Sequence, residues 1–338
     1  MSFHSHFFIR RLIGLGETDI ETIWRRIPQE SVAFKQIFFV KEKRVKEDLL
    51  IRKIFLFLST ISAALVLLII TFVFLESIPV FTSNLIVNIF QETTWRPAYN
   101  SFGILPLIVG SFVVVFIAIL IALPIGVGAS IYISEFAPKK LRDPLLSVIE
   151  LLASIPSVIY GFIGLVFLVP FISQLLKLNS GATALTASLI LIPMIVPIII
   201  SISSEILSSV PKEYREISAA LGASKFQTTL KVILPASKSG IFASVILAFG
   251  RAIGETIAVL FVCGATGKFP SFPFITESVL TMTSAIAMYM GEAAIGENLY
   301  YVLFFIGFSL MLISFIVNNI AERIVEKQRE KVGGIRIW

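Results

Sequence analysis

Long runs without a charged side chain limit what this chain can fold into. A helix needs roughly 20 apolar residues to cross the hydrocarbon core of a membrane. The uncharged runs are residues 54–75, 97–134, 151–176, 178–204 and 298–321. The run 97–134 is too long for one straight crossing, so we expect a helix from about Leu107 that bends at Pro124, Gly126 and Gly128. The sequence therefore predicts several membrane-spanning helices.

A sixth candidate span, residues 239–264, is uncharged apart from Arg251 and Glu255. In the fourth run, Pro193 and Pro197 are expected to kink the helix. Hydrophobic residues make up 56% of the chain and charged residues 15%, which leaves too little polar surface to cover a soluble globule. The predicted fold class is all-α, a polytopic membrane protein with six transmembrane helices.

Cysteine and histidine are too scarce to suggest metal or redox chemistry. Cys263 is the single cysteine, which excludes an internal disulfide and a multi-cysteine metal cluster. The two histidines, His4 and His6, lie at the extreme N-terminus. We therefore expect no metal site.

Positive charge is distributed unevenly between the loops. Most of the 28 Lys and Arg residues lie before the first span, after the second, after the fourth or after the last. The exceptions are Arg96, Lys177, Arg251 and Lys268. Cytoplasmic loops retain Lys and Arg during insertion, so both termini are expected in the cytoplasm. The chain is then a multi-pass protein of the cell inner membrane.

The uncharged segment 278–291 is shorter than the ~17 residues that a span needs. Counting it as a span would also place the basic tail outside. We expect an external or re-entrant helix, with an ordinary loop and a surface helix as the alternative.

One charged stretch, EYREISAALGASKFQTTLKVILP at residues 213–235, lies between the fourth and fifth spans. Pro211 and Glu213 suit the start of a helix. Gly222 can adopt the left-handed conformation that ends this helix, and Ser224 with Gln227 forms a capping box for a second helix.

Both predicted helices are amphipathic. The apolar positions are Val210, Tyr214, Ile217 and Leu221 in the first, and Phe226, Leu230 and Ile233 in the second, which ends at Pro235. Two such helices outside the bilayer suit a groove in another protein, and a loop lying on the membrane is the alternative.

The spacing in this stretch resembles the EAA loop of ABC importer permeases. In that family Glu-Ala-Ala is followed by three residues, Gly, nine residues and Ile-x-Leu-Pro. Here Glu216 is followed by Gly222 and then by Val232-Ile233-Leu234-Pro235, while Ile217 and Ser218 replace the two alanines. The resemblance implies that the loop at 206–236 docks on an ATP-binding subunit. The implied contact residues are Glu216, Ala219, Leu221, Gly222, Ala223, Leu234 and Pro235.

Four further stretches resemble the PstC family of phosphate-specific ABC transport permeases. They are GILPLIVGS at 103–111, IYISEFAP at 131–138, ELLASIPSVIYGFIGL at 150–165 and GRAIGETIAV at 250–259. The resemblance implies the type I ABC importer permease (MetI-like) fold. It also implies a heterodimer with a PstA-like permease, a dimer of PstB-like ATP-binding subunits and an external PstS-like phosphate-binding protein. The predicted domains are a cytoplasmic extension at 1–50, the permease domain at 51–325 and a cytoplasmic tail at 326–338.

The chain lacks a phosphate-binding loop of the GxxxxGK[ST] type, because GATGK at 264–268 has neither the first Gly at the right spacing nor the final Ser or Thr. It also lacks the HExxH and GxSxG motifs. We expect a non-catalytic subunit without a cofactor, with ATP and Mg²⁺ on the partner ATPase. We expect the subunit to contact membrane lipid. We expect no nucleic-acid partner.

Arg251 and Glu255 are the charged pair within the fifth predicted span. An ionised side chain there costs at least a few kcal/mol, so both should face the bundle interior or water. They are four residues apart and can pair along one helix face, while Gly250 and Gly254 allow another helix to approach closely. Either Arg251 serves a route for phosphate and Glu255 holds it in place, or the pair only locks helices across the heterodimer.

Three classes of function remain: an ABC importer permease, a secondary transporter or channel, and a membrane enzyme. The first is favoured because the polar stretch 213–235 has no evident purpose in the other two. Inverted repeats, which many secondary transporters carry, are not evident. Phosphate as the substrate rests on the resemblance, with arsenate or another oxyanion as the alternative. Residues 1–50 either lie on an anionic inner leaflet or form a disordered tail.

The charge distribution gives a prediction about topology. Cysteines placed at Ser224 and Ser271, in a chain whose Cys263 is replaced by Ala, should react from opposite sides of the membrane. The measurement is labelling with an impermeant maleimide in intact cells and in inverted vesicles. Labelling of both positions from outside would contradict the arrangement with six spans.

Overall fold

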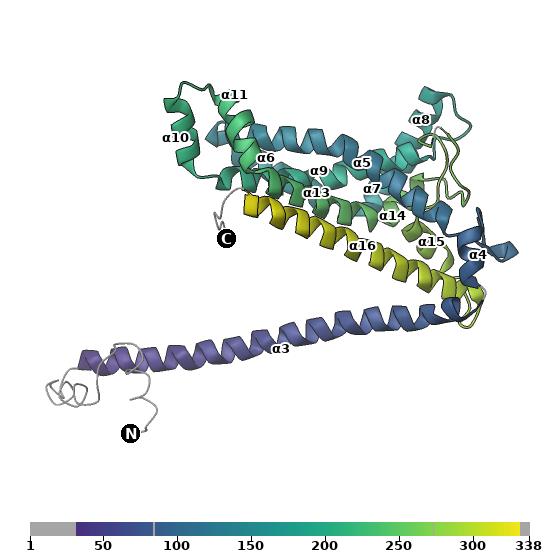
Figure 1. Cartoon of the computed structure of the whole chain (residues 1–338), viewed down its shortest axis with the longest axis horizontal. Coiled ribbons are helices and arrows are strands. Elements are labelled where there is room, and N and C mark those ends of the chain that lie inside the picture. The colour runs from purple at the N-terminus through teal and green to yellow at the C-terminus, as the bar shows by residue number, and fades with distance from the viewer. Residues whose placement is uncertain (1–31, 84, 273, 332–338) are drawn as a thin grey trace. The chain divides into compact units, whose positions relative to one another are not determined.

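The computed structural model describes residues 32–83, 85–272 and 274–331 (Figure 1). The chain divides into two compact units, residues 1–69 and 70–338. Helix α3 (Val32–Thr82) begins in the first unit and ends in the second. The predicted extension at 1–50 is thus helical from Val32 onward, and its first 31 residues lie outside the described ranges, as do the last residues of the tail.

Among the described residues, five helical segments are long and apolar enough to cross a membrane. They are Ile51–Thr82, Leu105–Phe136, Ser157–Leu176, Ala184–Ser209 and Asn298–Ile320. A sixth is obtained if Lys225–Ala236 and Lys238–Ile253, which meet at an angle of 68°, count as one span. The predicted number of six corresponds to this upper count.

The second predicted span is one continuous helix over most of its length. Helix α5 (Leu105–Ile131) runs through Pro124 and passes into the π-helical turn η2 (Tyr132–Phe136). The π-helical turn ends where Ala137 adopts an extended conformation before Pro138. Extended backbone before proline is expected, because the proline ring clashes with a helical residue in that position. Glu135 therefore lies in the last turn of this span.

The predicted start of the third span at residue 151 is wrong. Helix α6 (Lys139–Ser154) ends at Ile155, which is extended because Pro156 follows it. The apolar span begins only at Ser157 and consists of α7 (Ser157–Ile163), the π-helical turn η3 (Gly164–Leu168) and α8 (Val169–Leu176). Helix α6 is therefore a separate element.

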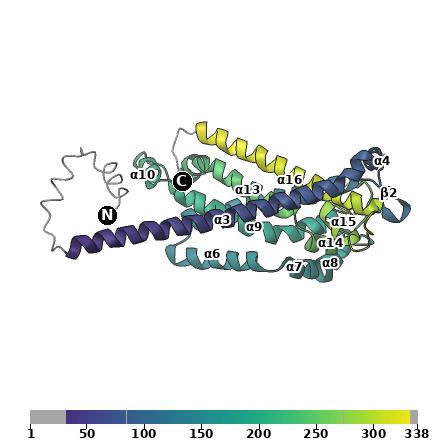
Figure 2. The same ribbon diagram turned by 90° about the horizontal axis from the view of Figure 1, so that it is seen from below.

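Helix α9 (Ala184–Ser209) lies at the centre of the second unit. It begins at Ala184 rather than at residue 178, because the side chain of Thr183 caps it by accepting a hydrogen bond from the backbone of Thr186. Figure 2 shows α9 between α6 and α13 (Lys238–Ile253), and it also packs along α5. Serine hydroxyls cross both packed faces: Ser188 donates to the Val114 carbonyl of α5 at 3.0 Å, and Ser203 and Ser244 of α13 share a hydrogen bond of 2.9 Å.

The fifth predicted span, continuous from 239 to 264, is also corrected. Helix α13 ends at Ile253, and a second helix, α14 (Ile257–Val262), follows after three residues that leave the helical path. Gly254 weakens the helix at this point. The carboxylate of Glu255 accepts a hydrogen bond from the backbone of Ala258 at 3.4 Å, in the manner of a helix cap.

A further group of short elements lies at the end of the bundle opposite α10 (Lys212–Ala220) and α11 (Lys225–Thr228) (Figure 1). They are α4 (Leu85–Gln91), the antiparallel strands β1 (Trp95–Arg96) and β2 (Ser101–Phe102) with the 3₁₀ turn η1 (Pro97–Tyr99) between them, and α15 (Met282–Tyr289). Helix α16 (Asn298–Lys331) packs against α13 and α15. Because Met282 and Ala285 are fully buried, α15 packs inside the protein rather than lying on its surface.

Close packing of α7 on α14 gives a prediction about stability. A Cβ at Gly161 would lie 2.8 Å from the Cα of Ala258 and 2.9 Å from the Phe261 ring, whereas a Cβ at Gly128 would meet nothing within 4 Å. Gly161→Val should therefore destabilise the chain by about 1–3 kcal/mol through overpacking.

Gly128→Val is the matched control, because it adds the same side chain in open space. The measurement is thermal unfolding of each variant in detergent. Equal unfolding temperatures for the two variants would show that the contact between α7 and α14 is not as close as described.

Candidate functional site

Four short helical elements connect α9 to α13. They are α10 (Lys212–Ala220), α11 (Lys225–Thr228), the π-helical turn η4 (Thr229–Ile233) and α12 (Leu234–Ala236). We call residues 210–236 the connecting segment. In Figure 1 its helices α10 and α11 project from one end of the bundle.

The turn between α10 and α11 has the predicted conformation. Gly222 has a φ of 80°, in the left-handed region. Its backbone N–H donates to the Ala219 carbonyl at 2.9 Å, and that of Ala223 donates to the Ser218 carbonyl at 3.1 Å. This is the Schellman pattern of a helix C-terminus. Glycine is favoured here for its backbone, since a Cβ at Gly222 would meet nothing within 4 Å.

The second predicted local feature, the capping box, is also present. Ser224 accepts from the Gln227 backbone at 3.3 Å, and the Gln227 side chain accepts from the Ser224 backbone at 2.9 Å. A hydrogen bond of 2.9 Å between the buried hydroxyls of Ser218 and Thr228 then joins α10 to α11. The two helices are thus fixed to each other as one unit.

The apolar side chains of the connecting segment have two orientations. Val210 and Ile233 are buried against Leu207 and Ile241 at the base. Ile217 and Leu221 of α10 and the turn after it instead expose 63% and 84% of their surface, and Phe226 of α11 exposes 61%. We call Ile217, Leu221 and Phe226 the exposed apolar patch. The apolar positions predicted for the first helix are therefore divided: Val210 packs against the bundle, whereas Ile217 and Leu221 are exposed.

The predicted contact residues are distributed in the same way. Glu216, Ala219, Leu221, Gly222 and Pro235 are exposed, whereas Ala223 and Leu234 are half-buried. The predicted helix end at Pro235 is wrong by one residue, because proline is tolerated in the first turn of α12, which continues to Ala236. The chain then bends by 68° into α13.

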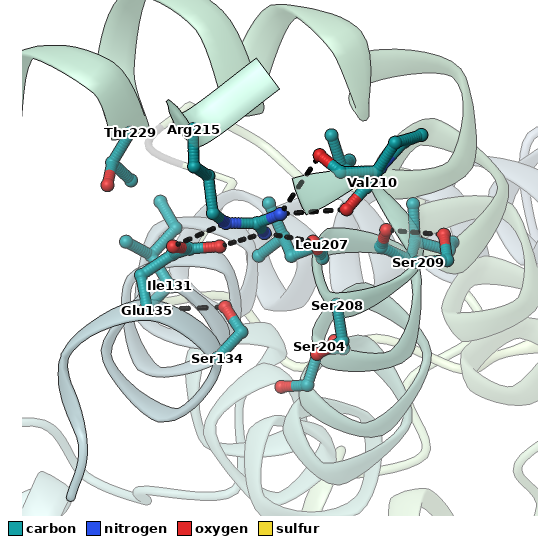
Figure 3. Close-up of polar contacts among 12 residues, drawn as sticks. Ile131, Ser134, Glu135, Ser204, Leu207, Ser208, Ser209, Val210, Arg215 and Thr229 are labelled. Carbon is teal, nitrogen blue, oxygen red and sulfur yellow. Dashed lines mark hydrogen bonds and ion pairs between the residues drawn. The ribbon is translucent and has the colours of Figure 1, made fainter. Parts of the chain in front are cut away.

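Arg215 attaches this projecting unit to the bundle (Figure 3). Its Nη2 lies 2.6 Å from Glu135 Oε1 and its Nε lies 3.3 Å from Oε2, which makes a bidentate ion pair with the end of the second span. Nη2 also donates to the Leu207 carbonyl at 2.9 Å and Nη1 to the Val210 carbonyl at 2.7 Å. A cation is favourable at this position, because the last carbonyls of α9 have no partner within the helix.

A second contact joins the same two regions. The Nζ of Lys225 in α11 lies 5.3 Å from the centre of the Phe136 ring, within range of a cation–π interaction. Sequence reasoning missed both contacts, since it treated Arg215 and Lys225 only as markers of orientation. The available signal was Glu135, an acidic residue directly after a long uncharged run.

The structure places Arg251 and Glu255 differently from the prediction. The two residues do not lie on the same face of one helix, because α13 ends between them. Glu255 is 8% exposed, and its carboxylate accepts a hydrogen bond from the Ala258 backbone in the first turn of α14. Arg251 is exposed on α13, and the described part of the chain offers its guanidinium no ion pair or hydrogen bond. The predicted pairing is therefore not formed within this chain.

Gly250 of α13 and Gly254, the residue directly after this helix, are both exposed, as is Arg251. A Cβ at Gly250 would meet nothing within 4 Å, and one at Gly254 would meet only backbone atoms of α13. The predicted close approach of a helix thus does not occur between described elements of this chain. Nor do three His, Cys, Asp or Glu side chains of the described residues come together as a metal site.

Comparison with known proteins identifies the family. Residues 122–330 match the family described as binding-protein-dependent transport system inner membrane component. The chain is 40% identical to the probable ABC transporter permease protein YqgH of Bacillus subtilis over 68% of its own length and 74% of the relative. It is 35% identical to the phosphate transport system permease protein PstC of Xylella fastidiosa over 73% and 81%, respectively.

A relative from an archaeon and a solved structure agree with these matches. The probable PstC of Methanocaldococcus jannaschii is 32% identical over 79% of this chain and 90% of that protein. A chain of a bacterial alginate ABC transporter superposes with a TM-score of 0.59 at 14% identity, covering 84% of this chain and 96% of its own length, which supports the fold alone. The all-α fold is thus that of type I ABC importer permeases, and the protein belongs to the family of binding-protein-dependent transport system inner membrane components, as an ABC transporter permease of the PstC type.

Proposed function

We propose that this chain is the PstC-like subunit of an ABC importer for inorganic phosphate and forms part of the translocation pathway. The observation that carries the proposal is the similarity to several phosphate transport permeases along most of their length. The connecting segment supports it independently, because it presents exposed apolar side chains on two helices that are fixed to each other. A secondary transporter or channel has no need of such an element.

The proposed partners are a PstA-like permease, a dimer of PstB-like ATP-binding subunits and a PstS-like phosphate-binding protein. The exposed apolar patch, together with Glu216, Ala219 and Gly222, is the proposed docking surface for the ATPase. Ala223, Leu234 and Pro235 complete the proposed set of contact residues. Helix-in-groove recognition of this kind uses apolar anchors spaced along a short helix.

The proposed orientation places both termini and the connecting segment in the cytoplasm, within the cell inner membrane. The asymmetry of Lys and Arg supports this, because those residues are retained on the cytoplasmic side. The external side is then the end that carries α4, α15 and the β1–β2 hairpin, where the PstS-like protein delivers phosphate.

Arg251 is the proposed phosphate-facing residue, and Gly250 and Gly254 are the proposed packing positions for the PstA-like chain. An unpaired guanidinium on a helix surface is costly in lipid, which supports a position that faces water or another chain. Glu255 is proposed to act indirectly, because its carboxylate holds the break between α13 and α14. Arsenate or another oxyanion is the alternative substrate, since a guanidinium favours any tetrahedral anion of this kind.

The test of this function is purification of the native complex, combined with uptake of radiolabelled phosphate in proteoliposomes. Copurification of an ATPase and uptake that requires ATP are expected, with phosphate taken up in preference to sulfate. Gly222→Val should abolish most of the uptake and reduce ATPase copurification, because a β-branched residue disfavours the φ of 80° by roughly 1–2 kcal/mol.

Gly222→Asn is the matched control, because asparagine tolerates the left-handed conformation. It should retain most of the uptake. Normal uptake by Gly222→Val at normal expression would show that the connecting segment does not couple the chain to an ATPase. Uptake without any ATPase would favour a secondary transporter.

Arg251 provides a separate prediction. Arg251→Gln should lower phosphate uptake per assembled complex by about tenfold or more, the effect expected for a lost hydrogen bond to a charged group. Assembly with the second permease should persist, and it is measured by copurification. Lys238→Gln removes an exposed cation from the other end of α13 and should leave uptake unchanged. Wild-type uptake by Arg251→Gln would exclude the pathway role, and loss of assembly alone would favour the helix lock.

A further inference from the structure

Arg215 joins its own helix to two other elements, through five contacts made by a single side chain. It belongs to α10, it pairs with Glu135 at the end of η2, and it donates to the Leu207 and Val210 carbonyls at the end of α9. The fifth contact, from Nη1 to the Pro211 carbonyl at 3.5 Å, is the longest. Guanidinium is suited to this role because its planar fork binds a carboxylate with two nitrogens and still has donors for carbonyls.

The backbone alone would leave the projecting unit poorly fixed. Helix α9 ends at Ser209 and α10 begins at Lys212, so Val210 and Pro211 form the whole covalent connection on this side. Both residues adopt extended ψ angles of 127° and 143°, and the chain turns there. Arg215 lies one helical turn beyond this junction and binds the elements on its far side. It therefore restricts rotation of α10 about the junction.

The contact between Lys225 and Phe136 restricts the other helix of the unit. Phe136 is the neighbour of Glu135 in η2, and Lys225 begins α11. The two helices that carry the exposed apolar patch are thus attached to two adjacent residues at the end of the second span, α10 to Glu135 and α11 to Phe136. These contacts connect the patch to α5 through η2 and to α9 through its terminal carbonyls.

We propose that Arg215 and Glu135 are positioning residues for energy coupling, which transmit movement of the ATPase-docked helices into α5 and α9. This rests on the proposed coupling function of the connecting segment. The pair is partly removed from solvent, with 6% of the Glu135 side chain and 28% of the Arg215 side chain exposed. Buried ion pairs often add little net stability, so transmission rather than folding is the role that we assign to it.

The test uses Glu135→Gln and Arg215→Lys in the complete transporter reconstituted with its ATPase. Glu135→Gln keeps the shape of the side chain but removes its charge, and Arg215→Lys keeps the charge but cannot bind all three elements. Each variant should copurify with the ATPase as the unchanged chain does, because the exposed apolar patch is untouched. The phosphate transported per ATP hydrolysed should fall about tenfold, while ATP hydrolysis continues.

Arg142→Lys is the matched control. Arg142 lies in α6 and donates to Ser208, at the same end of α9, at 2.6 Å, but it has no hydrogen bond or ion pair with the described residues of the connecting segment. It should leave transport per ATP unchanged. A fall of the same size in this control would mean that any loosening at the end of α9 uncouples the transporter, and the assignment to Arg215 would then be wrong.

Two other outcomes would overturn the proposal. In the first, uptake and ATP hydrolysis fall in proportion, or both variants lose ATPase copurification. The ion pair would then serve only as an anchor for assembly. In the second, both variants transport as much phosphate per ATP as the unchanged chain. The Arg215–Glu135 pair would then have no role in coupling. By contrast, absence of an ATPase from the complex of the unchanged chain would contradict the proposed function itself, which keeps the two failures distinguishable.

Discussion

The burial of α9 between α5, α6 and α13 is the constraint on which the rest of the chain depends. Apolar side chains cover most of this helix, and serine hydroxyls fix it to both α5 and α13. Its C-terminal carbonyls are therefore held in place by the bundle. Arg215 of the connecting segment binds those carbonyls. The packing of α9 in the bundle therefore sets the position of the connecting segment.

The same bundle explains why a membrane chain tolerates charges at two of its helix ends. At the end of α5, the Glu135 carboxylate is paired and almost fully buried. At the end of α13, Glu255 is buried but satisfies the backbone of Ala258 instead of a cation. Arg251 has no such partner among the described residues and is exposed. The two glutamates are thus explained within one chain, whereas the described residues provide no ion-pair or hydrogen-bond partner for the arginine.

Local rules of the sequence predicted the parts of this structure that depend on a few neighbouring residues. The left-handed Gly222, the capping box of Ser224 and Gln227 and the approximate positions of most spans belong to this group. The helix breaks at Ile155 and Gly254 were missed, although Pro156 was a readable signal for the first. The uncharged length of a run does not show where a helix within it stops, since an apolar residue is equally suited to lipid on either side of a break.

Contacts between distant segments could not be predicted in this way. Glu135 and Arg215 are 80 positions apart, and no local pattern links them. Their proximity follows from the parallel packing of α5 and α9, which brings the C-terminal end of the second span beside the residues that follow α9. For the same reason, the spacing of Arg251 and Glu255 was misleading: four residues indicate a shared face only while the helix continues. A sequence therefore indicates which charges are costly, but the fold determines which partner balances each one.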